Sequence, residues 1–281
     1  MQRDIGMEFM AASNYPPETL TDEQKGLPRP ESPHYSNYSD NSDNSDKITF
    51  KLPSPEDTVY SSHSVYGGSG SSCGCEDPAA GPEGFGGPNG RRSLFEILRT
   101  RRSIRRYSAE EISAECLSYL LWASCGISGE SDEFRTAPSA GAIHPVETSL
   151  SIQNCSWLPK KDGIWRYNPT EHELSLVAEG IDAVAGLGRA CMMQPQVLRA
   201  PVVFFWTAKP YRAVWKYGPR GYRDIFLDAG HICQNLYLAG VDADIGVCAI
   251  NAFADEAVKA QLRLPEDEVV VYAASCGHKR R

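Results

Sequence analysis

The chain has 281 residues, of which 41% are hydrophobic, and it is long enough to bury a sizeable core in one large domain or two small ones. Residues 1–92 hold 14 acidic and 7 basic side chains, so −7 of the net charge of −8 lies there and the rest of the chain is close to neutral. This excludes the broad positive surface that follows a nucleic acid, and no stretch approaches the roughly 20 apolar residues of a membrane span.

The first 92 residues differ in composition from the rest. They contain 10 of the 19 prolines and 11 of the 24 glycines, and residues 39–46 repeat a short polar, acidic unit. Such a segment buries too little apolar surface to offset the entropy of ordering it. We therefore expect a largely irregular, low-complexity extension over 1–92 and a folded domain over 93–281. Two islands, residues 48–52 with strand-like alternation and residues 84–88, are expected to lie along the domain surface.

The ends and the cysteines give expectations about the compartment. The start of the chain, MQRDIGMEFMAAS, lacks the basic and apolar parts of a secretory signal, so we expect a soluble cytoplasmic protein. Nine cysteines, an odd number, are spread along the chain and are expected to be reduced thiols. Cys73 and Cys75 form a C-x-C pair without a second pair, so no metal site is expected.

Periodic apolar residues begin at Ser93 and predict three helices. Leu94, Ile97 and Leu98 mark a short one, and a capping box of Ser108 with Glu111 is expected to open a second. The buried face of that second helix is expected to consist of Ile112, Cys116, Leu117, Leu120 and Leu121. A third, central helix is predicted from residue 222 to about residue 240.

Strand patterns lie between and after these helices, at residues 146–152, 164–167, 173–177, 202–206 and 268–274. The second and third are joined through Asn168-Pro169 and predict a hairpin. Helices and strands do not alternate strictly, so the sequence predicts an α+β fold with a largely antiparallel sheet. No G-x-G-x-x-G follows a strand and no G-x-x-x-x-G-K occurs, which argues against a Rossmann site or a phosphate-binding P-loop.

A cationic run between the first two predicted helices is the first candidate site. Arg101, Arg102, Arg105 and Arg106 flank the hydroxyl of Ser103. Arginine offers fixed donors and a permanent charge, and backbone N–H groups near a helix start add neutral donors, which together suit a phosphate monoester. A solvated basic turn remains the alternative explanation.

Two further segments combine unusual residues. Residues 135–145 are rich in small side chains and contain two prolines, which let backbone amides approach a flat ligand; a tight structural turn, with His144 merely packed, is the alternative. Residues 215–223 place Lys216 and Tyr217 in a predicted Gly/Pro loop before the central helix, where a lysine can serve as a general base; an ordinary charged loop is the alternative.

Taken in order, the motifs RRSIRRY, RTAPSAGAIHPVE, WKYGPRGYRDIFLDAGHICQNL and INAF resemble the nitroreductase superfamily, and specifically its SagB-type branch. The resemblance spans residues 93–277. This branch includes dehydrogenase subunits that oxidise thiazolines and oxazolines in modified peptides. The resemblance implies a nitroreductase-like fold that binds FMN at the interface of a homodimer.

The resemblance also assigns residues. It implies that FMN contacts Arg101, Arg102, Ser103 and Arg105 of one chain and Pro138, Ser139, Ala140 and Gly141 of the partner chain. It also places Ala249, Ile250, Asn251 and Ala252 beside flavin N5. Lys279 or Arg280 is expected to reach the phosphate region, and Arg106 to be a surface charge. Ala252 stands where many relatives have glycine. The catalytic pair implied is Lys216, as the base that takes a proton from carbon, and Tyr217, while the hydride passes to flavin N5.

Three functions follow as hypotheses. The first is an FMN-dependent dehydrogenase that oxidises an azoline or another peptide-derived substrate, with a cyclodehydratase as a candidate partner. The second is an NAD(P)H-dependent reductase of nitroaromatics, quinones or activated alkenes, which shares the fold and the flavin. The third is a non-catalytic binding or scaffold member of the family.

Overall fold

The computed structural model describes residues 5–12, 21–30, 47–55 and 92–280. Its centre is a seven-stranded sheet in the order β1-β4-β3-β2-β5-β7-β6, and every neighbouring pair of strands is antiparallel. The strands are β1 (Thr49–Lys51), β2 (Val146–Ile152), β3 (Gly163–Asn168), β4 (Glu173–Glu179), β5 (Val202–Ala208), β6 (Ile245–Ile250) and β7 (Val269–His278). The predicted α+β fold with an antiparallel sheet is confirmed.

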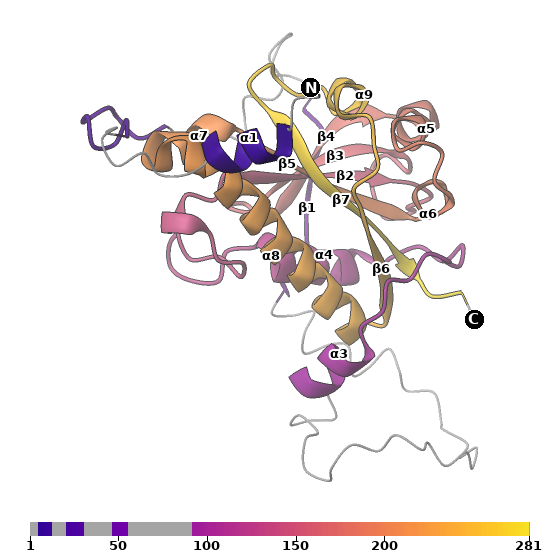
Figure 1. The fold of residues 1–281 in the computed structure, drawn as a ribbon. Coiled ribbons are helices and arrows are strands. Elements are labelled where there is room, and N and C mark those ends of the chain that lie inside the picture. The colour runs from indigo at the N-terminus through magenta and orange to yellow at the C-terminus, as the bar shows by residue number, and fades with distance from the viewer. Residues whose placement is uncertain (1–4, 13–20, 31–46, 56–91, 281) are drawn as a thin grey trace.

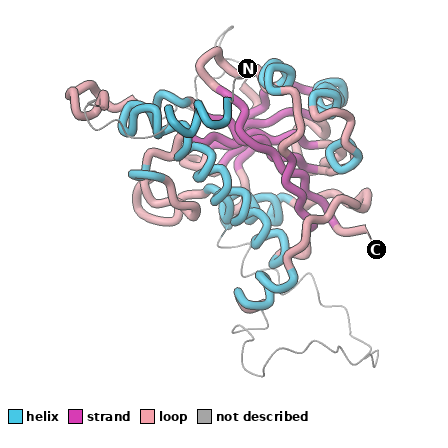
Figure 2. The backbone as a smooth tube through the Cα atoms, in the orientation of Figure 1, coloured by secondary structure: helices cyan, strands magenta, loops and turns pink. Residues whose placement is uncertain are grey.

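Helices cover both faces of the sheet, as Figures 1 and 2 show. The long helix α8 and helix α4 lie on one face, and α5, α6 and α9 lie on the other. The helices are α1 (Ile5–Ala12), α3 (Leu94–Thr100), α4 (Ala114–Cys125), α5 (Ile181–Ala190), α6 (Pro195–Leu198), α7 (Pro210–Tyr217), α8 (Gly221–Asp242) and α9 (Asp255–Gln261), with short 3-10 turns η3 (Ala140–Ala142) and η4 (Gly218–Arg220). Within the described ranges, no helix combines the length and the apolar character that a membrane crossing requires.

The central strands are buried on both faces, which explains their continuous apolar sequence. In β5, Phe204 and Trp206 face the helices α4 and α8, whereas Val203 and Phe205 face α5 and α9. All four side chains are almost completely buried. Two hydrophobic clusters result, one on each face, and the sheet with its long helix forms a rigid support for the surrounding loops.

Most predicted elements are present. The central helix α8 extends from residue 221 to residue 242, and β3 and β4 form the predicted hairpin. The capping box predicted for the second helix is wrong: α4 begins at residue 114 with Ser113 as its N-cap, and Glu111 instead accepts hydrogen bonds from Ser156, 2.6 Å from both its backbone nitrogen and its hydroxyl. A capping box does occur one helix earlier, between Ser93 and Glu96.

The segment before α8 also differs from its prediction. Residues 210–217 form helix α7 rather than a loop, because Pro210 occupies the first turn, where its missing N–H costs nothing. Gly218 then ends the helix with a positive φ of 57°. Lys216 and Tyr217 therefore lie in the last turn of a helix, on a fixed backbone.

Part of the extension is joined to the sheet. Strand β1, which falls within the predicted island at residues 48–52, pairs with β4, and the following Leu52 is 4% exposed in the main hydrophobic cluster. The second island, 84–88, lies outside the described residues, as do Cys73 and Cys75. The seven described cysteines are free thiols. The division of the chain at residue 92 stays a prediction.

Candidate functional site

The cationic segment is fixed between α3, α8 and β6. Arg101 ends α3, and its guanidinium carbon lies 5.2 Å from the centroid of the Tyr237 ring in α8. Ser103 lies 3.0 Å from the Tyr237 hydroxyl, oxygen to oxygen, and the next residue, Ile104, donates its N–H to the carbonyl of Val247 in β6. The predicted phosphate-binding residues are therefore held in place at the end of the molecule where α8 finishes.

The other arginines of this run point outward. Arg102 is exposed and its guanidinium donates to the carbonyl oxygens of Arg99 and Arg101. Arg105 and Arg106 are exposed as well. Arg101 and Ser103 are therefore the members of the predicted set that contact α8, whereas the side chains of Arg102, Arg105 and Arg106 are exposed.

The predicted N5 segment meets the cationic segment through one tyrosine. The Tyr237 hydroxyl accepts the N–H of Ala249 at 2.8 Å, besides its contact with Ser103. Ala252 is exposed, and its carbonyl oxygen accepts a bond of 2.7 Å from the side chain of Gln194. The exposed backbone after β6 is thus anchored at both ends, with Ile250 buried and Asn251 exposed between them.

Sequence reasoning missed Tyr237. It lies one residue after Leu236, inside the apolar repeat of the predicted central helix, where a tyrosine can be a core residue. The usable signal was its hydroxyl, because a buried Tyr O–H requires a hydrogen-bond partner.

The C-terminal basic residues lie near the cationic segment. The backbone of Lys279 forms an isolated antiparallel β-bridge with Tyr107. The ammonium group of Lys279 pairs with Asp244 at 2.7 Å. The backbone N–H of Arg280 donates to the carbonyl of Arg106. The strand end therefore lies beside the predicted phosphate site, with the Lys279 charge directed to Asp244.

A second group of predicted residues lies around the loop of small side chains. The Ser139 hydroxyl donates to Asp228 of α8 at 2.6 Å and accepts the N–H of His144 at 2.9 Å. Gly141 has a φ of +57°, and a Cβ at this position would collide with the Tyr217 hydroxyl. Only glycine fits here without strain, since it combines the left-handed backbone with close packing.

The predicted catalytic pair, Lys216 and Tyr217, packs on this same loop. A Cβ at Gly141 would lie 3.1 Å from Lys216 Nζ, so the lysine amine directly adjoins the loop backbone. Lys216 Nζ also lies 5.9 Å from the centroid of the Tyr217 ring. The structure therefore brings Lys216 and Tyr217 together with Gly141, which is exposed in the loop of small residues.

Asp228 is a buried carboxylic acid that the sequence did not reveal as part of the site. Burial raises its pKa to about 6, although the Ser139 hydroxyl and the backbone N–H of Ala140 stabilise the ionised form. The residue is 4% exposed. It anchors the loop to α8, and its position inside the apolar repeat of that helix was the available signal.

Arg212 of α7 fixes the far end of the loop. Its guanidinium donates to the carbonyl oxygens of Ile143 and His144, and it pairs with the buried Glu147 at 3.2 Å. His144 has a positive φ of 47°, and burial lowers its pKa. Its ring contacts the carbonyl of Glu133 at 2.9 Å, which indicates a structural role in the loop.

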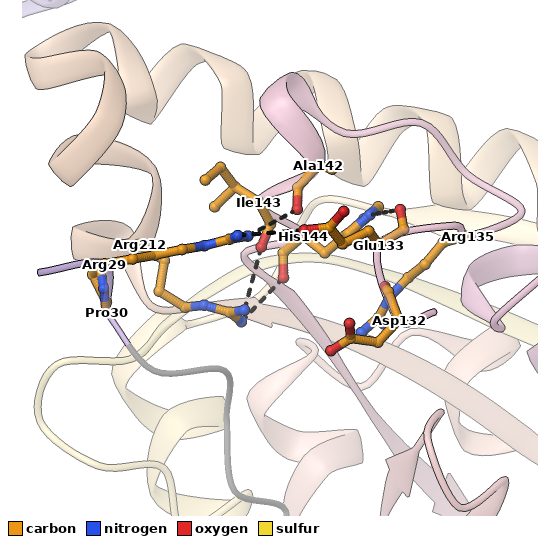
Figure 3. A pocket seen from close by; sticks show the side chains of 9 residues that line it. All are labelled: Arg29, Pro30, Asp132, Glu133, Arg135, Ala142, Ile143, His144 and Arg212. Carbon is orange, nitrogen blue, oxygen red and sulfur yellow. Dashed lines mark hydrogen bonds and ion pairs between the residues drawn. The ribbon is translucent and has the colours of Figure 1, made fainter. Parts of the chain in front are cut away.

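A cavity of about 230 Å³ opens beside this loop. Figure 3 shows that charged side chains and loop backbone line it. The lining residues are Arg29, Pro30, Asp132, Glu133, Arg135, Ala142, Ile143, His144 and Arg212. Arg29 pairs with Glu133, and Arg212 is bonded to backbone carbonyls of the loop, so fixed polar groups line the cavity.

The two groups are separated along α8. Tyr237, in the second half of the helix, contacts the cationic and N5 segments, and Asp228, in the first half, contacts the loop of small residues. Nine residues of helix correspond to about 14 Å. One chain therefore presents the two groups of predicted site residues, which we call the two half-sites, at different places along α8.

An α+β domain with one antiparallel sheet, a long central helix and these two half-sites has the layout of a flavin-dependent oxidoreductase. The chain belongs to the nitroreductase family, whose model matches residues 98–278.

Individual relatives agree with this assignment. The nitroreductase-family protein MJ1384 of Methanocaldococcus jannaschii is 30% identical over 175 residues, which cover 62% of this chain and 85% of that protein. The trifolitoxin-processing protein TfxB of Rhizobium leguminosarum bv. trifolii is 29% identical over 108 residues, 37% of this chain and 29% of TfxB.

Solved structures share the fold. A nitroreductase-like protein from Anabaena variabilis superposes with a TM-score of 0.57 at 29% identity, covering 66% of this chain and 37% of that chain. A chain of the Escherichia coli microcin synthetase McbBCD complex, solved with truncated pro-MccB17 bound, has a TM-score of 0.59 at 18% identity, covering 73% and 79%. At that identity the second similarity concerns the fold alone.

Proposed function

We propose that this nitroreductase-family protein is an FMN-dependent oxidoreductase of SagB type that acts as a dehydrogenase on an azoline or another peptide-derived substrate. The observation that carries the proposal is the packing of Lys216 and Tyr217 against the Gly141 loop. The similarity to TfxB, a trifolitoxin-processing protein, supports a peptide-derived substrate. A cyclodehydratase, as the class of enzyme that makes azolines, is the partner this proposal implies.

The donor set suits a phosphorylated flavin. Arg101 and Ser103 offer a permanent charge and a hydroxyl for the phosphate, with Arg102 and Arg105 as outer charges and Lys279 and Arg280 nearby. The exposed backbone at Asn251 and Ala252, and the loop from Pro138 to Gly141, offer small surfaces that a flat ring can approach.

A homodimer would unite the two half-sites. In this proposal the loop of small residues from one chain meets the cationic segment of the other. Apolar side chains support it, because Leu94 and Leu98 of α3 and Phe226 and Leu227 of α8 are each more than half exposed. Such exposed apolar faces mark interaction surfaces.

Gly230 adds a further argument for association. It occupies an exposed position of α8, and a Cβ there would meet nothing within 4 Å among the described residues. Glycine inside a helix costs about 0.5–1 kcal/mol relative to alanine. The single chain has no steric reason to carry that cost, so a close approach by a second chain accounts for the glycine.

Lys216 and Tyr217 would carry the proton chemistry. The Lys216 amine takes the proton from the substrate carbon, and Tyr217 orients the lysine or the substrate, since the end of α7 and the Gly141 loop fix both side chains. When bound, the flavin supplies the acceptor for the hydride.

A visible spectrum and anaerobic mixing test this function. Purified protein should be yellow, and added FMN should raise its melting temperature. Slow or absent bleaching by NADPH supports the dehydrogenase, whereas rapid bleaching supports an NAD(P)H-dependent reductase. Folded protein without flavin absorbance or an FMN-dependent shift would exclude both, and would favour a binding or scaffold protein.

The variant Lys216→Ala tests the base. We expect turnover of an azoline peptide to fall about 100-fold or more while FMN remains bound, because general-base catalysis contributes about 10²- to 10⁴-fold. The control is Lys161→Ala, at an exposed loop position, which should keep normal turnover. Unchanged turnover in Lys216→Ala would remove this lysine from the mechanism.

A further inference from the structure

A segment of the N-terminal extension, residues 21–30, lies on the candidate catalytic helix, and we name it the N-terminal strap. It begins with a turn of its own: Thr21 and Gln24 exchange side-chain and backbone hydrogen bonds, and Asp22 pairs with Lys25 at 3.2 Å. These contacts, all within residues 21–25, define the turn independently of the contacts with the domain.

Three hydrogen bonds attach the strap to α7. The backbone N–H of Glu23 donates to the carbonyl of Trp215 at 3.0 Å, and Trp215 Nε1 donates to the carbonyl of Leu27 at 3.0 Å. The hydroxyl of Tyr211 donates to Asp22 at 3.1 Å. Trp215, the residue directly before Lys216, accepts one of these bonds and donates another, so the strap is fixed next to Lys216 and Tyr217.

The other end of the strap reaches the loop of small residues. Arg29 donates to the carbonyl of Ala142 at 3.2 Å and pairs with Glu133 at 3.6 Å, and Arg29 and Pro30 line the cavity in Figure 3. The strap therefore spans from α7 to the loop, which are the two elements that enclose Lys216.

One side chain of the strap, that of Glu23, forms an ion pair with Lys216. Glu23 Oε1 lies 3.7 Å from Lys216 Nζ, and the side chains are 42% and 29% exposed. An exposed pair of this kind contributes at most about 1 kcal/mol to folding. The hydrogen bonds of Trp215 already hold the strap on α7. The main effect of the Glu23–Lys216 ion pair is therefore to hold the flexible Lys216 side chain in one place.

We propose that Glu23 is a positioning residue for Lys216, contributed by the N-terminal strap of the same chain. Its carboxylate holds the ammonium group beside Tyr217 and the Gly141 loop, between turnovers of the proposed dehydrogenase. The inference uses the proposed function only in giving Lys216 its role as base. It gives part of the extension a place in the site.

The test measures the chemical reactivity of Lys216 in the full-length chain. Acetylation by sulfo-N-hydroxysuccinimide acetate at low ionic strength is followed by peptide mass spectrometry, with the exposed Lys161 as internal reference. The Glu23 carboxylate covers part of the amine and holds it in place, so Glu23→Gln should label Lys216 about two- to fivefold faster than the native chain. Glu23→Asp, which keeps the charge, should return the rate toward the native one.

Two controls separate positioning from general loosening of the strap. Lys25→Gln removes an ion pair of the same turn and should leave the labelling of Lys216 at the native rate. Sodium chloride at 0.5 M should raise the rate in the native chain and not in Glu23→Gln, because salt screens exposed pairs.

Equal labelling of Lys216 in the native chain and in Glu23→Gln would overturn the proposal, as would an equal acceleration in Lys25→Gln. Neither readout requires flavin or substrate. A failure here is therefore distinguishable from a failure of the proposed dehydrogenase, which the spectrum and the turnover assays decide.

Discussion

Single polar residues of α8 connect the candidate site to the scaffold. Tyr237 joins the cationic segment to the end of β6, and Asp228 joins the loop of small residues to the same helix. A polar side chain within an apolar repeat was the only signal that the sequence offered for either residue, and it did not identify the partners, which are distant along the chain. Arg101 and Ser103 could be singled out from the sequence because the charges cluster within one short run, and their role stays a prediction.

Asp228 predicts a pH dependence of stability. Its folded pKa of about 6 lies above the ordinary value of 3.8, so folding favours the protonated form, and this contribution is lost as the pH rises toward and through 6. Relative to Asp228→Asn, the native chain should lose about 2 kcal/mol of unfolding free energy between pH 4.5 and 7.5. Urea unfolding at both pH values measures this. Parallel changes in the two proteins would contradict the assignment.

Tyr237 predicts a local effect on cofactor affinity. Tyr237→Phe removes the hydroxyl that links Ser103 to Ala249 and should weaken FMN binding about three- to tenfold, the range of one hydrogen bond. Quenching of flavin fluorescence gives the dissociation constant. The matched control is Tyr119→Phe, whose hydroxyl donates to Asp242 on the same helix, and an equal loss in that variant would remove the special role of Tyr237.

At the scale of elements, periodicity decided what the sequence could predict. The continuous apolar strands and the long helix α8 were predicted because the residues that they bury recur at regular spacing in the sequence. Helix α7 was taken for a loop because Gly218 and Pro219 dominate the local pattern. The start of α4 was misplaced because Ser108 with Glu111 and Ser113 are both plausible cap positions in sequence, and only packing selects Ser113. Helices α5 and α9 and strand β6 were not predicted; α9 has only seven residues and β6 only six.

Strand β1 predicts that the extension contributes to folding. Leu52→Ala should lower the unfolding free energy by about 2–5 kcal/mol, since the side chain is 4% exposed in the main cluster. Leu27→Ala, at a position 46% exposed, should change it by less than about 0.5 kcal/mol. Denaturant unfolding followed by circular dichroism compares them. Equal small effects would show that β1 adds nothing to the domain.

For the whole molecule, the central question is how two half-sites become one. Each chain carries both halves about 14 Å apart along α8, by helix geometry. The sequence did not show that the two segments attach to α8 through Asp228 and Tyr237, because these contacts join residues far apart along the chain. A homodimer remains the arrangement we propose.

Gly230→Ala tests that arrangement. Alanine should raise the intrinsic stability of α8 by about 0.5–1 kcal/mol, because no described residue of the chain would contact its methyl group. At a close interface the same methyl group should weaken association about tenfold. Sedimentation over a concentration series, with unfolding measured on dilute protein, separates the two effects. A more stable variant that associates like the native chain would place Gly230 away from the interface.

The pairing of β1 with β4 also orders events during synthesis. Thr49 precedes its partner Ser175 by about 125 residues, and at about 5–20 residues per second the ribosome supplies that partner only about 6–25 seconds later. The strap can bind α7 only after a longer interval, because Trp215 follows Glu23 by nearly 200 residues. Both segments are thus placed late, and the seven excess negative charges of residues 1–92 oppose their association with neighbouring nascent chains during that delay.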